Sequence, residues 1–94
     1  MEVIVRKSAE KDIKEIYDWY EHQETGLGED FLEEFARSIP YLESFPVSFR
    51  IRYKNFRISS ISRFPYLIYF RIVKQTIIVQ HVGHAHRSRR KLKL

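Results

Sequence analysis

The hydrophobic period changes halfway along the chain, and this change limits the folds open to it. Before residue 45 apolar side chains recur at helical spacing, first at Ala9, Ile13, Ile16, Tyr17 and Tyr20. From Phe49 onward they alternate with polar residues or form short continuous runs, which is typical of strands. A chain of 94 residues has room for one core, so both halves are expected in a single α+β domain over residues 1–94.

Two helices are expected in the first half, after a short strand over residues 2–7. Ser8 is placed to cap the first helix, and Gly26 is a candidate for the left-handed residue that ends it. The second helix begins near Gly28 and buries Phe31, Leu32, Phe35, Ile39 and Leu42. Pro40 predicts either a kink or a separate last piece, because an interior proline removes a backbone hydrogen bond. The short link between the helices favours an antiparallel helical hairpin.

Four strands are expected in the second half. Phe49 to Lys54 alternates apolar and basic residues, with Asn55 as the turn that follows. Residues 56–63, the apolar run 66–73 and residues 76–84 complete the set, and Lys74–Gln75 is the last turn. The predicted fold is therefore a strand, a helical hairpin and a four-stranded, mostly antiparallel sheet, in the order β-α-α-β-β-β-β.

The formal net charge of +5 conceals two opposed halves. Residues 1–48 hold all twelve carboxylates and five basic residues, a net charge of −7. Residues 49–94 hold twelve basic residues and no carboxylate, a net charge of +12. This asymmetry favours an anionic partner for the second half, whereas the acidic residues suit the solvated faces of the helices.

Several classes of protein are excluded by composition. The chain has no cysteine, which rules out a disulfide framework, thiolate catalysis and cysteine-based zinc sites. It has no apolar run near the roughly 20 residues that span a bilayer. The start Met-Glu-Val-Ile-Val-Arg-Lys does not resemble a signal peptide, so we expect a cytoplasmic protein without membrane association.

Basic side chains provide the first candidate site. Arg50, Arg52 and Lys54 share one face of the expected strand, at a spacing of about 6.5–7 Å that suits either nucleic-acid phosphates or an ordinary solvated face. Arg57 and Arg63 add to the positive half. For Arg71, inside the central strand, we expect an ion pair with a carboxylate of the helices. The basic tail over about residues 86–94 suits either solvent exposure or an acidic partner.

The histidines near the end of the chain are the second candidate. On a strand His84 and His86 share a face and His81 points to the other. The second half offers no further metal ligand, so we expect neither a metal nor a cofactor. Basic neighbours favour a neutral imidazole, which suits a general base in metal-free RNA cleavage. For His81 we expect an ordinary structural role instead.

Four segments in order resemble the RelE/ParE superfamily of type II toxin–antitoxin systems. They are Asp12–Tyr20 in the first helix, the Gly-Leu-Gly-x-x-Phe junction at 26–31, Arg63–Phe70 with its Phe-Pro-Tyr strand, and the His-x-x-Arg ending at 84–87. RelE-like members place an arginine where Tyr66 stands here and often a tyrosine after the position of His84. These departures favour the ParE-like branch, whose members include plasmid stabilization proteins.

The resemblance implies a growth-inhibiting toxin that binds DNA gyrase and forms a hetero-oligomer with a cognate antitoxin from an adjacent gene. Target or antitoxin contacts are then expected at Arg50, Arg52, Lys54, Arg63, Tyr66, Arg89 and Arg90. One alternative is a ribosome-dependent mRNA endoribonuclease with His84 as acid or base and Arg57 or Arg87 on the phosphate. Another is a nonspecific nucleic-acid-binding module.

Overall fold

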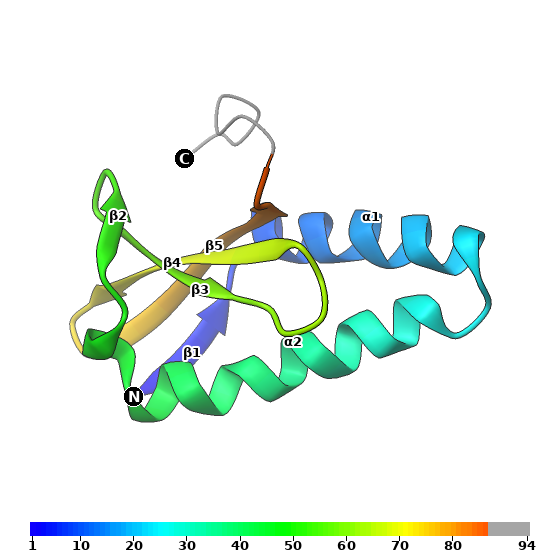
Figure 1. Ribbon diagram of the computed structural model, residues 1–94. Coiled ribbons are helices and arrows are strands. Elements are labelled where there is room, and N and C mark those ends of the chain that lie inside the picture. Colours follow the sequence, from blue (N-terminus) through cyan, green and yellow to red (C-terminus); the bar gives the residue numbers. More distant parts are fainter. Residues whose placement is uncertain (87–94) are drawn as a thin grey trace.

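The computed structural model describes residues 1–86, which form one strand, two helices and then four more strands. The predicted α+β order is confirmed (Figure 1). The elements are β1 (Glu2–Val5), α1 (Lys7–Gln23), α2 (Leu27–Ser44), the 3-10 turn η1 (Pro46–Ser48), β2 (Ile51–Tyr53), β3 (Phe56–Ser60), β4 (Tyr66–Val73) and β5 (Thr76–His84).

All five strands belong to one mixed sheet in the order β1-β5-β4-β3-β2. The last four strands, β2 to β5, pair antiparallel with one another, as predicted. β1 lies parallel to β5, with Val3 opposite Ile77, so the first strand joins the sheet at its far edge. A parallel pair needs a long crossover connection, and the helical hairpin is part of the one that separates these two strands.

The start of α1 lies along the edge of β5 where β1 ends. The backbone N–H of Arg6 donates to the carbonyl of Val79 at 3.0 Å. The hydroxyl of Ser8 donates to the carbonyl of Gln80 at 2.6 Å. The predicted N-cap role of Ser8 is therefore wrong. The helix already begins at Lys7, and the Ser8 hydroxyl forms its hydrogen bond with the backbone of β5 instead of with the helix.

Two glycines shape the turn between the helices. Gly26 adopts the left-handed φ of +92°, but it immediately precedes α2, whereas α1 already ends at Gln23. The Oε1 atom of Glu21 accepts the N–H groups of Gly26 and Gly28 at 2.9 Å each and so caps α2. A Cβ atom on Gly28 would lie 2.7 Å from the carbonyl oxygen of Tyr17, so only glycine lets the helices approach this closely.

Pro40 does not divide the second helix, which runs unbroken from Leu27 to Ser44. Pro40 cannot donate a hydrogen bond to the carbonyl of Ala36 one turn earlier. Both residues are exposed, so water can reach that carbonyl. The exposed position therefore explains why neither the predicted kink nor a separate piece is needed for the helix to continue.

The helices pack their apolar stripes on one face of the sheet. Ala9, Ile16, Phe31 and Leu42 meet Ile68, Phe70, Ile77, Val79 and Val82 in the core. An aromatic cluster extends this core toward the turn between the helices, with Phe31 in edge-to-face contact with Phe64 and Tyr66. In Figure 1 that turn lies at the end of the molecule opposite to β2.

The first three strands are shorter than expected, and β1 ends at Val5 rather than at residue 7. β4 and β5 match the predicted ranges, and the turn between them, Lys74–Gln75, has positive φ at both residues. The predicted strand from Phe49 to Lys54 shortens to Ile51–Tyr53, because Lys54 adopts a left-handed φ of 52° in the turn before β3. β3 ends at Ser60 rather than at Arg63.

Candidate functional site

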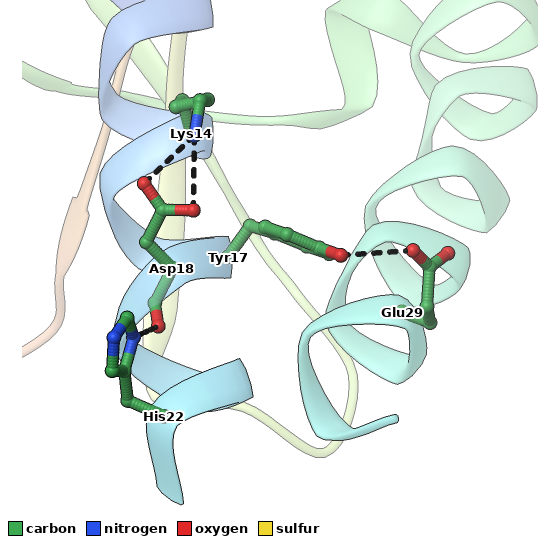
Figure 2. Close-up of polar contacts among 5 residues, drawn as sticks. All are labelled: Lys14, Tyr17, Asp18, His22 and Glu29. Atoms are coloured by element: carbon green, nitrogen blue, oxygen red, sulfur yellow. Dashed lines mark hydrogen bonds and ion pairs between the residues drawn. The ribbon is translucent and has the colours of Figure 1, made fainter. Parts of the chain in front are cut away.

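Local polar contacts engage several side chains of the two helices (Figure 2). Lys14 Nζ lies 2.8 Å from Asp18 Oδ2, and the ring of His22 bonds to the carbonyl oxygen of Asp18. Tyr17 donates its hydroxyl proton to Glu29 Oε1 at 3.1 Å, across the two helices. This hydrogen bond raises the pKa of Tyr17 above its usual value of 10.0, because the Glu29 carboxylate favours the protonated phenol.

His81 has the ordinary structural role that we expected. It is buried, and its Nδ1 atom lies 2.8 Å from Asp12 Oδ2 on α1. The same carboxylate oxygen accepts the backbone N–H of Val82 at 3.0 Å. Asp12 therefore fixes the histidine and also occupies the edge of β5 that β1 does not reach.

His84 lies at the end of β5, opposite Tyr66 of β4. The two rings are in edge-to-face contact with centroids 5.2 Å apart, and the ring of His86 lies 5.6 Å from that of His84. The backbone N–H of His86 donates to Nδ1 of His84 at 3.1 Å, so a neutral His84 carries its proton on Nε2. Tyr66 is itself buried in the core, and its ring packs against that of His84.

Arg57 holds the segment that precedes β2. Its Nη1 atom donates to the carbonyl of Phe49 at 2.6 Å and lies 3.5 Å from that of Val47. Arg57 pairs with Phe70 across β3 and β4, four residues along β4 from Tyr66. The strand rise and spacing then separate Arg57 from His84 by about 13 Å along the sheet and about 10 Å across it. The structure does not bring these two candidate catalytic residues together.

Arg63 is occupied by contacts within the chain. Its Nη1 atom lies 3.0 Å from Glu34 Oε2, and its guanidinium stands 5.9 Å from the ring centre of Phe64. Arg37 of α2 shares the same buried carboxylate at 3.5 Å. Because Glu34 serves both cations, Arg63 helps to join the β3–β4 loop to α2 in addition to presenting positive charge.

Arg50, Arg52 and Lys54 are all exposed, but only Arg52 lies within a strand. Lys54 stands over the ring of Tyr53 at 5.5 Å. The predicted three-residue stripe on one strand face is therefore wrong in its geometry. The cations instead gather around the turn and the short strand β2. The candidate residues Arg87, Arg89 and Arg90 of the tail lie outside the described residues.

Arg71 does not form the predicted ion pair with a carboxylate in the described part of the chain. Its Nε atom is buried without a hydrogen-bond partner there. Arg71 pairs with Ile78 in the ladder, and its neighbours Phe70 and Ile72 pack in the core. Strand alternation thus turns Arg71 to the face away from the helices, which carry nearly all the carboxylates.

The sequence did not reveal a groove between α2 and β3. It has a volume of about 590 Å³ and is lined by side chains of α2, by Phe49 and by residues 58–60 and 62. Beside it, exposed apolar side chains follow the chain from the end of α2 to β2. Tyr41, Phe45, Val47 and Ile51 are between 55% and 70% exposed. The predicted apolar stripe of the second helix did not include Tyr41 or Phe45, but the sequence did not show that these four side chains form one surface.

Two site classes find no support within residues 1–86. No group of three histidine, aspartate or glutamate side chains there is placed to hold a metal ion. No helix in that range combines the length and the apolar character that crossing a bilayer requires.

Comparison with known proteins identifies the family. The family model described as "ParE toxin of type II toxin-antitoxin system, parDE" matches residues 3–89. The chain belongs to the ParE toxin family. A solved structure described as the chromosomal ParDE TA system from P. aeruginosa superposes with a TM-score of 0.83 at 17% sequence identity, covering 92% of this chain and 97% of that one. No curated protein matches.

The ParE family explains the sequence segments that first suggested it. The Gly-Leu-Gly junction forms the turn and close contact between the helices, and the Phe-Pro-Tyr segment leads into β4 and the aromatic cluster. His84, the first residue of the His-x-x-Arg segment, is the last residue of β5. The ParE-like features that can be described are thus mainly elements of the fold, and the exposed cations Arg50, Arg52 and Lys54 lie outside these segments.

Proposed function

We propose that this ParE-family protein inhibits bacterial growth by binding DNA gyrase and is neutralised by a cognate antitoxin encoded next to it. The match of the ParE family model to residues 3–89 carries this proposal. The second half of the chain, with a net charge of +12, suits a binding partner of negative charge.

The geometry favours binding over RNA cleavage. The predicted cleavage site pairs His84 with Arg57 or Arg87 at one phosphate; about 13 Å of strand separates Arg57 from His84 along the sheet, and Arg87 lies outside the described residues. The guanidinium of Arg57 also donates a hydrogen bond to the backbone carbonyl of Phe49. Both observations support a toxin that acts through contact.

A supercoiling assay with purified gyrase tests the target. Stoichiometric protein is expected to inhibit supercoiling, and the purified product of the adjoining gene is expected to restore it. Unimpaired gyrase at stoichiometric excess, together with codon-phased cuts in translated mRNA that disappear in His84→Ala, would establish the ribonuclease alternative instead.

A further inference from the structure

The outer edge of the sheet is only partly occupied by β2. Pairing between β2 and β3 extends over Ile51 to Tyr53 and reaches no further along β3 than Arg57. On its other side β3 remains paired with β4 as far as Ser60. Within residues 1–86, the backbone of residues 58–60 therefore faces no strand on its outer side. This edge, about 10 Å long, is a template for another extended chain.

The groove beside this edge supplies side-chain contacts for such a chain. The carboxylate of Glu34 lines the groove and is paired with Arg37 and Arg63. Five further lining positions lie on the two facing elements: α2 contributes Arg37, Ser38 and Tyr41, and β3 contributes Ser59 and Ser60. Hydroxyl groups at four of these five positions can donate to or accept from a peptide backbone. An extended segment laid along β3 would thus find hydrogen-bonding groups both on the strand and on the facing helix.

Exposed apolar surface continues from the groove onto η1 and β2, which follow the end of α2 along one side of the molecule (Figure 1). Of the eight large apolar side chains that are exposed within residues 1–86, four lie here: Tyr41, Phe45, Val47 and Ile51. An apolar concentration of this kind on a small protein marks a contact surface. Arg57 fixes it in place through its hydrogen bond to the carbonyl of Phe49.

The charge of this surface indicates the chemistry of its partner. Arg50 and Arg52 are exposed, and neither forms an ion pair with any described residue. The nearest carboxylate before them in the sequence is Glu43, and none follows. Unpaired cations beside apolar side chains complement a segment that alternates acidic and apolar residues.

We propose that this open-edge surface, comprising residues 58–60 of β3, Tyr41, Val47, Ile51, Arg50 and Arg52, binds an extended acidic segment of the antitoxin. The inference rests on the proposed function. The segment adds a strand to β3 in line with β2, its apolar residues cover Val47 and Ile51, and its carboxylates reach Arg50 and Arg52.

The test compares two double variants with a matched control, using the purified product of the adjoining gene as the probe. Two double variants alter the open-edge surface: Arg50→Glu/Arg52→Glu and Val47→Asp/Ile51→Asp. The control Lys7→Glu/Lys11→Glu makes the same charge change as the arginine variant, at exposed positions of α1. Each surface variant is expected to raise Kd about 100-fold or more, and the control to change it less than about 3-fold. Unchanged thermal unfolding establishes that the variants are folded.

Two further measurements separate the antitoxin from the gyrase target. Hydrogen exchange of the wild-type complex is expected to show protection of the amides of residues 58–60. The surface variants are expected to arrest growth as the wild type does and to escape rescue by the adjoining gene. Unchanged Kd, absent protection at residues 58–60, or loss of growth arrest with intact antitoxin binding would each overturn this inference. A wild-type protein that neither arrests growth nor binds the probe overturns the proposed function instead.

Discussion

The two strands that lie next to the edges of the sheet, β5 and β3, differ in how far their outer sides are covered. At one edge β1 pairs with β5, and beyond Val5 the next residues of the chain continue to satisfy β5 through Arg6, Ser8 and Asp12. At the other edge β2 pairs with β3 only near its beginning, and a groove lies where further pairing would be. β1 and β2 are the edge strands of the sheet, and the difference lies in the strands beside them. The outer side of β5 is covered by the chain itself as far as Val82, which we call the closed edge, and the outer side of β3 beyond Arg57 is the open edge.

This difference follows from how the polar groups are distributed. Helix α1 starts directly after β1, so a hydroxyl and a carboxylate from its first two turns lie beside β5. The segment after α2 carries Pro46, Val47 and Phe49 before β2 and has no carboxylate to offer β3. Short polar side chains thus satisfy the outer side of β5, whereas the segment before β2 presents mainly apolar and cationic side chains beside β3.

The largest expected effect comes from breaking the closed edge. Asp12→Ala removes the acceptor of both His81 and the Val82 amide, so we expect a loss of about 3 kcal/mol in the free energy of unfolding, measured with urea. Asp18→Ala, on the same helix but in an exposed ion pair, is expected to cost less than about 0.5 kcal/mol. Equal losses would show that Asp12 does not close the edge.

Helix α1 also makes a close contact with α2 at Gly28. Gly28→Ala brings a Cβ atom within 2.7 Å of the Tyr17 carbonyl, and we expect a loss of about 2 kcal/mol in the free energy of unfolding. Gly26→Asn serves as the control, because asparagine tolerates the left-handed conformation and nothing lies within 4 Å of a Cβ there. A larger loss for Gly26→Asn would contradict this account.

At the open edge, the expected effects on stability are smaller. Arg57→Ala removes the hydrogen bonds to the backbone at Phe49 and Val47, for an expected loss of about 1 kcal/mol in urea unfolding. Amide exchange in residues 47–53 should accelerate, while exchange in β5 stays unchanged. Accelerated exchange in both places would mean that Arg57 supports the whole sheet.

The smallest effect concerns the helical hairpin at alkaline pH. The hydrogen bond to Glu29 raises the pKa of Tyr17, so the folded protein keeps this proton at a pH where the unfolded chain loses it. The stabilisation by this phenol is therefore complete below about pH 10 and lost as the pH rises through the folded value. In Tyr17→Phe the decline in the free energy of unfolding as the pH rises above about 10 should be shallower than in the wild type.

Local patterns were sufficient to predict most of the elements. The apolar run from Tyr66 to Val73, the turn at Lys74–Gln75 and the strand up to His84 have clear periods and clear breaks, and their bounds are confirmed. The parallel pairing of β1 with β5 was not predicted, because it joins residues more than seventy positions apart. Nothing in the local spacing specifies such a partner.

Individual side chains were harder to predict, for the same reason. Ser8 has the sequence context of an N-cap, yet the neighbouring strand β5 provides its partner. Arg57 has the chemistry of a phosphate ligand, yet its guanidinium reaches a backbone carbonyl eight residues earlier. Arg50, Arg52 and Lys54 remain predicted contact residues, on a surface whose apolar members were recognisable only once the fold showed which side chains stay exposed.

The parallel pair of β1 and β5 also governs when the molecule becomes complete during synthesis. Glu2 lies opposite Thr76, so the first strand made must wait for the last one before it has a neighbour. β4 also needs β5 to fill its second side. A nascent chain that stops before Thr76 has neither pair, and we expect it to be a substrate for proteolysis rather than a shortened toxin. The topology thus delays completion of the sheet until β5 has been synthesised.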